Sequence, residues 1–232
     1  DNGAQTYAGP LAVMVNLASA SASEIYSAAI QDYERGIVIG STTTGKGTAQ
    51  VQLDNLAHGQ ATLTQRKFYR VTGGSTQNKG VIPDVKLVDI YNEEFGERKA
   101  KNALKWDTIP TAPFKREGSV QPYITKLTQS SEKRVAADSQ FNYLEARKLI
   151  AQKSADQKNV VLDINQRRTE LNDLEQQTLS IENRRRAAAG QVPYANWESY
   201  QASIDALIES RAKMKAYLRP ALPEEEAFIT EA

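Results

Sequence analysis

Two patterns predict an α/β fold followed by an α-helical domain. Over the first 90 residues, short apolar runs bounded by glycine and segments of alternating apolar and polar residues are typical of strands. From residue 123 to residue 218, most apolar residues recur at the spacing of a helix. We therefore expect a first domain over 1–90, a linker over 91–113 that is rich in charged and turn-forming residues, and a helical domain over 114–232.

The first expected strand is the apolar run Leu11–Val15, which follows Gly9 and Pro10. A helix should follow it, because side chains recur at helical spacing at Ile25, Ala28, Ala29 and Tyr33. Ser19 or Ser21 would lie at the start of this helix, where serine is a favoured cap and free backbone N–H groups can stabilise an oxyanion. The pattern indicates either a serine nucleophile or simply a capped helix that packs closely on a sheet.

A second strand is expected at Gly36–Gly40, and the loop after it is similar to a phosphate-binding motif. Gly40–Lys46 has the spacing G-x-x-x-x-G-K, which binds nucleotide phosphates when a serine or threonine and then a helix follow. Gly47 follows the lysine instead, and residues 49–53 and 61–65 alternate as strands do. The sequence therefore disfavours an ATP or GTP site and predicts a strand at each of these two positions.

Composition narrows the chemistry that the chain can perform. Its 232 residues carry a formal net charge of +1, contain no cysteine and include one histidine, His58. Thiol chemistry is therefore excluded, and a serine with a lysine base is the most economical pair for acyl transfer. A lysine base must be neutral, which burial or a nearby positive charge favours. We expect no cofactor, no metal, no nucleic-acid partner and no transmembrane segment, since no stretch approaches the roughly 18 apolar residues of a membrane span.

In the helical domain, apolar residues at close to coiled-coil spacing predict a long helix that packs on a partner or on the protein body. These residues are Val160, Ile164, Leu171, Leu174 and Ile181, interrupted by Arg167 and Thr178. After a break at Gly190–Pro193, a second amphipathic helix carries Ile204, Leu207, Ile208, Arg211 and Leu218. We interpret Arg184–Arg186 as cations at a helix end, where they suit the helix dipole, and not as a nucleic-acid patch.

Five motifs, taken in their order and spacing, resemble the C-terminal processing peptidases. They are Ser19–Glu24, Gly45–Gln50, Lys67–Arg70, Gly73–Gln77 and Gly80–Asp84. The resemblance covers about residues 7–90, and the helical region resembles the same family more loosely. It implies a Clp protease/crotonase-like architecture for the α/β part, of which this chain would hold the C-terminal half of the serine protease core.

The resemblance also implies roles for individual residues. Ser21 matches the family's nucleophile, Lys46 its general base, and Gln50 a residue that orients the lysine. The backbone N–H of Ala22 would be one oxyanion donor, and the second donor comes from a glycine-rich stretch upstream of the serine. Asp32 also matches a family position, which we interpret as structural support. The implied activity is that of a serine endopeptidase with a Ser-Lys dyad, which cleaves peptide bonds through an acyl-enzyme.

We expect this chain to be a fragment, because the family places a PDZ domain, an N-terminal helical region and half of the protease core before it. The implied substrates are envelope proteins recognised by their C-terminal tails, and the implied location is the periplasm. The expected partners are these substrates, the remaining N-terminal part of the protease and, by family analogy, a helical-repeat lipoprotein adaptor. Without its second oxyanion donor, the fragment alone should be inactive. The alternative function is a non-catalytic helical interaction module that docks an adaptor or the rest of the protease.

Overall fold

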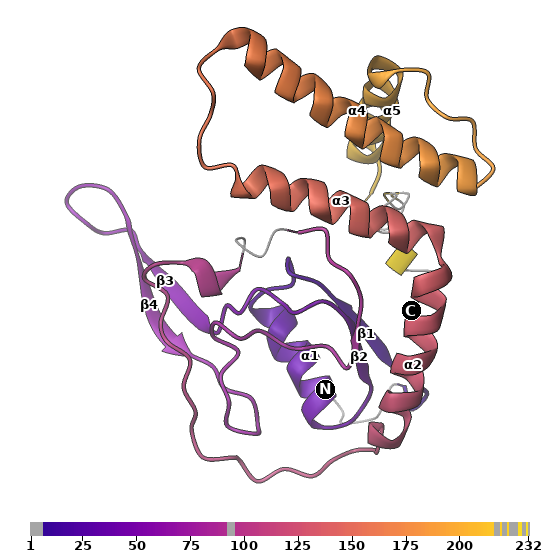
Figure 1. Ribbon diagram of the computed structural model, residues 1–232. Helices are drawn as coiled ribbons and strands as arrows, with labels where there is room; N and C mark the ends of the chain where they lie inside the picture. The colour runs from indigo at the N-terminus through magenta and orange to yellow at the C-terminus, as the bar shows by residue number, and fades with distance from the viewer. Residues whose placement is uncertain are drawn as a thin grey trace. The chain divides into compact units, whose positions relative to one another are not determined.

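The computed structural model describes residues 7–91 and 96–215, and the single residues 219, 222, 227, 228 and 231 (Figure 1). The described chain divides into two compact units. The first unit contains residues 7–87 and 96–132, and the second contains residues 88–91 and those described from 133 to 231. All strands that the structure describes lie in the first unit, and the second unit is built from helices.

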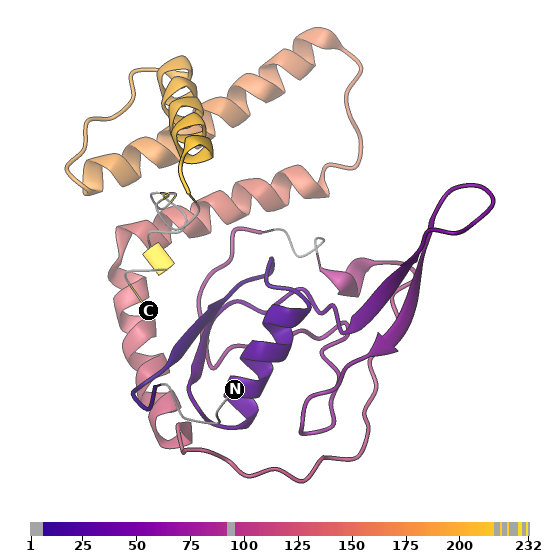
Figure 2. The ribbon, with the colours of Figure 1, turned by 180° about the vertical axis from the view of Figure 1, so that it is seen from behind.

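Three parallel strands form the sheet of the first unit, namely β1 (Ala12–Val15), β2 (Ile37–Gly40) and β5 (Val85–Lys86). Their order in the sheet is β1-β2-β5. Helix α1 (Ala22–Asp32) connects β1 to β2, and Figure 2 shows it lying along these two strands. The carboxyl ends of adjacent parallel strands meet at one edge of a sheet, so the loops after β1 and β2 lie together there.

Small and branched apolar residues explain how α1 packs on this sheet. Val15, Val38 and Val81 form a buried cluster with Ala28 of α1. A short alanine side chain at this position lets the helix approach the strands closely. Ile25, which shares the same helical pattern, is exposed, because it lies on the helix face that borders a cavity described below.

Strands β3 (Thr48–Leu53) and β4 (Ala61–Lys67) form a separate antiparallel hairpin, which extends from the first unit (Figure 1). The pairing register shifts between Ala49 and Gln50. The two strands that alternation predicted are therefore confirmed. Because the chain enters a strand soon after Lys46, the loop lacks the following helix that a nucleotide phosphate would require.

Strand β5 contains only two residues, although apolar residues recur in the sequence as far as Ile90. Beyond its two residues, Leu87 N–H still donates to Gly40 O at 2.8 Å. Gly40 is the last residue of β2, so the neighbouring strand has no further carbonyl to extend the ladder.

The helical region contains α2 (Gln121–Ala137), α3 (Ser139–Asp156), α4 (Ile164–Ala188) and α5 (Trp197–Lys213). The helices α3, α4 and α5 begin after side-chain caps, whose oxygens accept backbone N–H groups of the first turn, at Asp138, Asp163 and Asn196. The predicted fold class, α/β followed by an α-helical region, is confirmed. Of the helices in the described ranges, none combines the length and hydrophobicity needed to span a membrane.

Only part of the predicted apolar seam is buried inside the second unit. Ile181 is buried, whereas Ile164 and Leu171 are 57% and 56% exposed. Val160 lies in a break between α3 and α4 that the periodicity did not indicate. Leu218, the last residue of the second predicted amphipathic helix, lies outside the described residues.

The basic run Arg184–Arg186 lies in the last turns of α4, near its end at Ala188. Its central residue, Arg185, is buried and forms an ion pair with Glu182 at 2.7 Å. The guanidinium of Arg185 also lies over the ring of Tyr143, 5.4 Å from the ring centroid. This run therefore contributes to the packing of α4 on α3.

The packing of α3 can be tested with two leucines of the same helix. Leu144 is 0% exposed and Leu149 is 66% exposed. We expect Leu144→Ala to lower the free energy of unfolding by about 2–5 kcal/mol, because it leaves a buried cavity. Leu149→Ala should change it by less than about 1 kcal/mol. Urea denaturation of the full chain, followed by circular dichroism, measures both, and equal destabilisation would contradict the packing described.

Candidate active site

Ser21 lies at the turn between β1 and α1 and has an unusual backbone conformation. Its φ is 57° and its ψ is −111°. A side-chain-bearing residue rarely adopts this combination, which costs on the order of 1–3 kcal/mol and persists where neighbouring contacts enforce it, often at active sites. In α/β-hydrolases, the nucleophilic serine is exposed at the same strand–turn–helix position.

The neighbours of Ser21 have different roles. Ser19 Oγ accepts the N–H of Asn16 at 3.1 Å and so closes a turn, and Ser23 is exposed within the first turn of α1. Ala22 is the first residue of α1, and its N–H meets no acceptor among the described residues. This N–H can therefore receive an oxyanion that forms beside Ser21.

The buried carboxylate of Glu24 joins the loops after β1 and β2. Its Oε2 accepts the N–H of Ser21 at 2.9 Å and the N–H of Lys46 at 2.8 Å. Its Oε1 accepts the N–H of Gly45 at 2.7 Å and the hydroxyl of Thr43. Because one oxygen binds both amides, the backbones of Ser21 and Lys46 lie next to each other.

Glu24 was not among the residues that the sequence singled out, although a signal for it was present. Ser21–Glu24 has the pattern S-x-x-E, in which the glutamate reaches back to the N–H of the capping residue. Glu24 makes this bond and also reaches across to the loop after β2. Its side chain is 0% exposed, and a charge can be buried in this way only because several donors compensate it.

The loop that carries Lys46 is hydrogen-bonded along its length. Each backbone N–H from Thr43 to Gly47 has an acceptor; in order these are Val81 O, Ser19 O, the two oxygens of Glu24, and Gln77 Oε1. Gly45 has a φ of +87°, and a Cβ on Gly47 would lie 2.5 Å from Gln77 N. The positive φ therefore explains the glycine before the lysine, and the close approach of Gln77 explains the glycine after it.

Lys46 and Gln50 are placed differently. Lys46 is partly buried, and its side chain forms no ion pair within the described part of the chain. Gln50 is exposed on β3, and its Nε2 donates to Thr64 Oγ1 at 3.4 Å. No hydrogen bond joins Gln50 to Lys46 among the described residues, and its orienting role stays a prediction.

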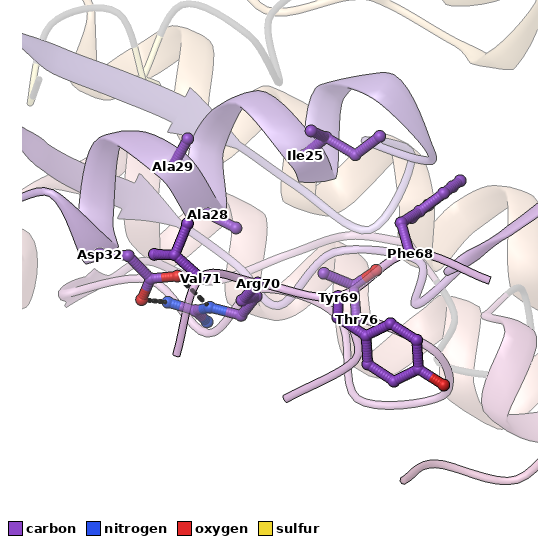
Figure 3. A pocket seen from close by; sticks show the side chains of 9 residues that line it. All are labelled: Ile25, Ala28, Ala29, Asp32, Phe68, Tyr69, Arg70, Val71 and Thr76. Carbon is purple, nitrogen blue, oxygen red and sulfur yellow. Dashed lines mark hydrogen bonds and ion pairs between the residues drawn. The ribbon is translucent and has the colours of Figure 1, made fainter. Parts of the chain in front are cut away.

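Asp32 at the end of α1 forms a two-pronged ion pair with Arg70. Its oxygens accept from Arg70 Nε at 2.9 Å and from Nη2 at 2.6 Å (Figure 3). The same Nη2 donates to Gln31 Oε1 at 2.8 Å. The pair ties the chain after β4 to α1, which agrees with the interpretation of Asp32 as structural support.

A cavity of about 100 Å³ opens between α1 and the chain after β4 (Figure 3). Beside the Asp32 and Arg70 pair, its lining is mainly apolar and includes Ile25, Ala28, Ala29, Phe68, Val71 and Thr76. Ile25 is one helical turn from Ser21, and Phe68 N–H donates to Gly47 O at 2.9 Å, so the cavity borders both candidate catalytic segments. The buried hydroxyl of Thr76 has no hydrogen-bond partner among the described residues and can serve a bound group.

An ion pair lies next to Tyr69, one of the residues that line this cavity. Lys67 Nζ lies 2.6 Å from Asp107 Oδ1, and its hydrogen bond lowers the pKa of the Asp107 carboxyl. Desolvation, followed by the hydrogen bond to Asp107, raises the pKa of the Tyr69 hydroxyl. Asp107 therefore stays ionised and Tyr69 stays neutral near pH 7. In the described ranges, no group of three or more acidic or histidine side chains is arranged to hold a metal ion.

Comparison with known proteins identifies the family. Residues 90–232 match the family model described as the C-terminal domain of tail specific protease, and residues 1–87 match Peptidase family S41. The chain belongs to the tail-specific protease family. The resemblance to the C-terminal processing peptidases that the five motifs predicted is thus confirmed.

Relatives of this tail-specific protease chain are much longer than the chain itself. It is 41% identical to the tail-specific protease of Haemophilus influenzae over 182 residues, which are 73% of this chain and 26% of that protein. It is 39% identical to the carboxy-terminal-processing protease of Bartonella bacilliformis over 86 residues, 37% of this chain and 20% of that protein. A solved photosystem II D1 C-terminal processing protease is 40% identical, with a TM-score of 0.32 over 34% of this chain and 21% of that chain.

The contribution of Glu24 can be tested by stability. Glu24→Ala leaves the N–H groups of Ser21, Gly45 and Lys46 without their acceptor. We expect it to lower the free energy of unfolding by about 3 kcal/mol or more. Ser23→Ala, an exposed change one residue away, should cost less than about 0.5 kcal/mol. Thermal unfolding compares the two variants, and similar stability would show that Glu24 does not hold the loops together.

Proposed function

We propose that the protein containing this chain is a serine endopeptidase in which Ser21 is the nucleophile and Lys46 the general base. The observation that supports this most strongly is the strained turn at Ser21, whose amide shares one oxygen of Glu24 with the amide of Lys46. A single buried contact thus sets the relative positions of both segments, as catalysis by proximity requires. The peptidase family of the chain supports the same activity.

In the acylation step, neutral Lys46 takes the proton of the Ser21 hydroxyl while Oγ attacks the scissile carbonyl carbon. The carbonyl oxygen becomes an oxyanion, which the N–H of Ala22 stabilises together with a second donor from outside this chain. Collapse of the intermediate breaks the C–N bond, and Lys46 gives its extra proton to the leaving amine. Ser21 then carries an ester of the substrate.

In the deacylation step, neutral Lys46 removes a proton from water, whose oxygen attacks the ester carbon. Collapse breaks the bond to Oγ, and the proton returns from Lys46 to Ser21, so one water is consumed per peptide bond. We assign Gln50 the role of orienting Lys46. For this, Oε1 of Gln50 must accept an N–H of the Lys46 side chain, while its Nε2 can keep the hydrogen bond to Thr64 Oγ1, which is 3.4 Å away.

The cavity lined by Ile25 and Phe68 is the proposed site for an aliphatic side chain of the substrate next to the scissile bond. Its volume of about 100 Å³ is below the roughly 150 Å³ of a cavity that holds benzene, so it suits a small aliphatic group and not a large aromatic one. The unpartnered hydroxyl of Thr76 can donate a hydrogen bond to a backbone carbonyl of the bound substrate.

The wider role in this proposal comes from the family. The names of the relatives describe tail-specific and C-terminal processing proteases. We propose that the substrates are envelope proteins of the periplasm, recognised by their C-terminal tails through a PDZ domain outside this chain. The remaining N-terminal part of the protease and a helical-repeat lipoprotein adaptor are the proposed partners.

Exposed apolar residues in the second unit favour a second candidate function, that of a non-catalytic interaction module. Leu162 precedes α4, and Ile164 and Leu171, seven residues apart on α4, are both exposed. Residues at this spacing lie on the same side of a helix, where exposed apolar side chains can contact another protein. In this alternative, the helical region docks an adaptor or the rest of the protease, and Ser21 has no chemical role.

Substitution of the two candidate catalytic residues separates these functions. In the full-length protease, we expect Ser21→Ala and Lys46→Ala each to reduce kcat/KM by about 10³-fold or more, because one lacks the nucleophile and the other the base. Cleavage of a protein with an apolar C-terminal tail measures this, with Ser23→Ala and Lys86→Ala as exposed controls. Cleavage by Ser21→Ala at the wild-type rate would eliminate Ser21 as nucleophile. Absence of cleavage by the wild type would favour the interaction module.

The proposed specificity site can be tested by filling it. Ala29→Leu adds a branched side chain to the cavity wall. We expect it to reduce kcat/KM about tenfold or more for substrates with leucine at the cleavage position, and to change it little for substrates with alanine there. Tyr26→Leu, an exposed change on α1 outside the cavity, serves as the control. An equal loss with both substrates would refute this assignment of the cavity.

A further inference from the structure

A segment beyond the strands of the first unit contacts the loop between β2 and β3. Residues 96–104 belong to the stretch that matches the C-terminal domain of tail specific protease, and they were expected to be part of a linker. They lie in the first unit. Glu97 N–H donates to Thr44 O at 2.9 Å, and Arg98 Nη2 donates to Thr43 O at 3.2 Å. The segment is thus bonded directly to the loop that carries the candidate base.

Gln77 connects the carboxylate of Glu97 to this loop. Its side chain is fully buried, and its Oε1 accepts the N–H of Gly47 at 2.8 Å. Its Nε2 donates to Glu97 Oε1 at 3.1 Å, while a second acceptor, Asn78 Oδ1, is 3.5 Å away. A side-chain amide has one accepting end and one donating end. A carboxylate at the donating end therefore keeps the accepting end toward Gly47.

Two buried side chains hold the peptide groups on either side of the Lys46 α-carbon. The N–H of Lys46 donates to Glu24 at 2.8 Å, and the N–H of Gly47 donates to Gln77 at 2.8 Å. With both peptide planes held, the two backbone dihedral angles of Lys46 are set, and so is the direction in which its side chain leaves the backbone. Loss of the bond to Gly47 would let one plane rotate and would move the lysine ammonium.

We propose that Glu97 is a positioning residue for Lys46 that acts through Gln77, an inference that rests on the proposed peptidase function. Its carboxylate fixes the amide of Gln77, the amide fixes the peptide of Gly47, and this peptide directs the lysine. Glu97 also lines a cavity of about 340 Å³ together with Thr48 and Gln50. The first residues of the C-terminal domain therefore support the loop that carries Lys46.

The test uses the full-length protease with Glu97→Ala, Glu97→Gln and Lys99→Ala. Lys99 is an exposed residue of the same segment, and its side chain makes no hydrogen bond or ion pair among the described residues. We expect Glu97→Ala to lower kcat by about 10- to 100-fold at nearly constant KM, because the base is misplaced while substrate binding is retained. Glu97→Gln should restore most of the activity, since its amide oxygen still accepts from Gln77. Lys99→Ala should match the wild type.

Hydrogen exchange supplies a readout that does not depend on activity. If Glu97 holds Gln77 in place, the peptide that contains Gly47 should exchange about tenfold faster in Glu97→Ala than in Lys99→Ala, with no change in a peptide from α1. Unchanged exchange and unchanged kcat in Glu97→Ala would overturn the proposal, and so would a change in KM alone. Faster exchange in a protein whose Ser21→Ala variant still cleaves would keep the loop contact but refute the peptidase assignment and, with it, the positioning role in catalysis.

Discussion

The hydrogen bonds of the Glu24 carboxylate are the interaction on which the rest of the candidate site depends. A carboxylate without exposure to solvent is costly unless donors surround it, and Glu24 receives them from both loops of the site. The same bonds hold Ser21 in its strained conformation, so the cost of that strain is offset by contacts made elsewhere. Removal of the carboxylate would therefore release the serine and the lysine loop together.

The parallel sheet explains why one side chain, that of Glu24, can bind the loops that carry Ser21 and Lys46. Strands β1 and β2 are adjacent and point in the same direction, so their following loops emerge at a common edge. Ser21 begins α1 in the first loop, and Lys46 lies in the second. Glu24, one turn into α1, is close enough to both to bind their amides.

The lysine loop has a second support that belongs to the C-terminal domain by sequence. Gln77 fixes the peptide after Lys46, and Glu97 fixes Gln77. The segment around Glu97, which the family match assigns to the C-terminal domain, thus helps to hold the loop that carries Lys46.

Periodicity and motif spacing were enough to predict the order of strands and helices, the serine at the start of α1 and the glycine-flanked Lys46, because these features depend on residues close together in the chain. The tertiary structure alone decided the roles of Glu24, Gln77 and Glu97. Their hydrogen bonds to Lys46, Gly47 and Gln77 join residues 22, 30 and 20 positions apart. The S-x-x-E pattern indicates only the local bond of Glu24 to Ser21, whereas these longer-range bonds depend on where two distant segments meet in the fold.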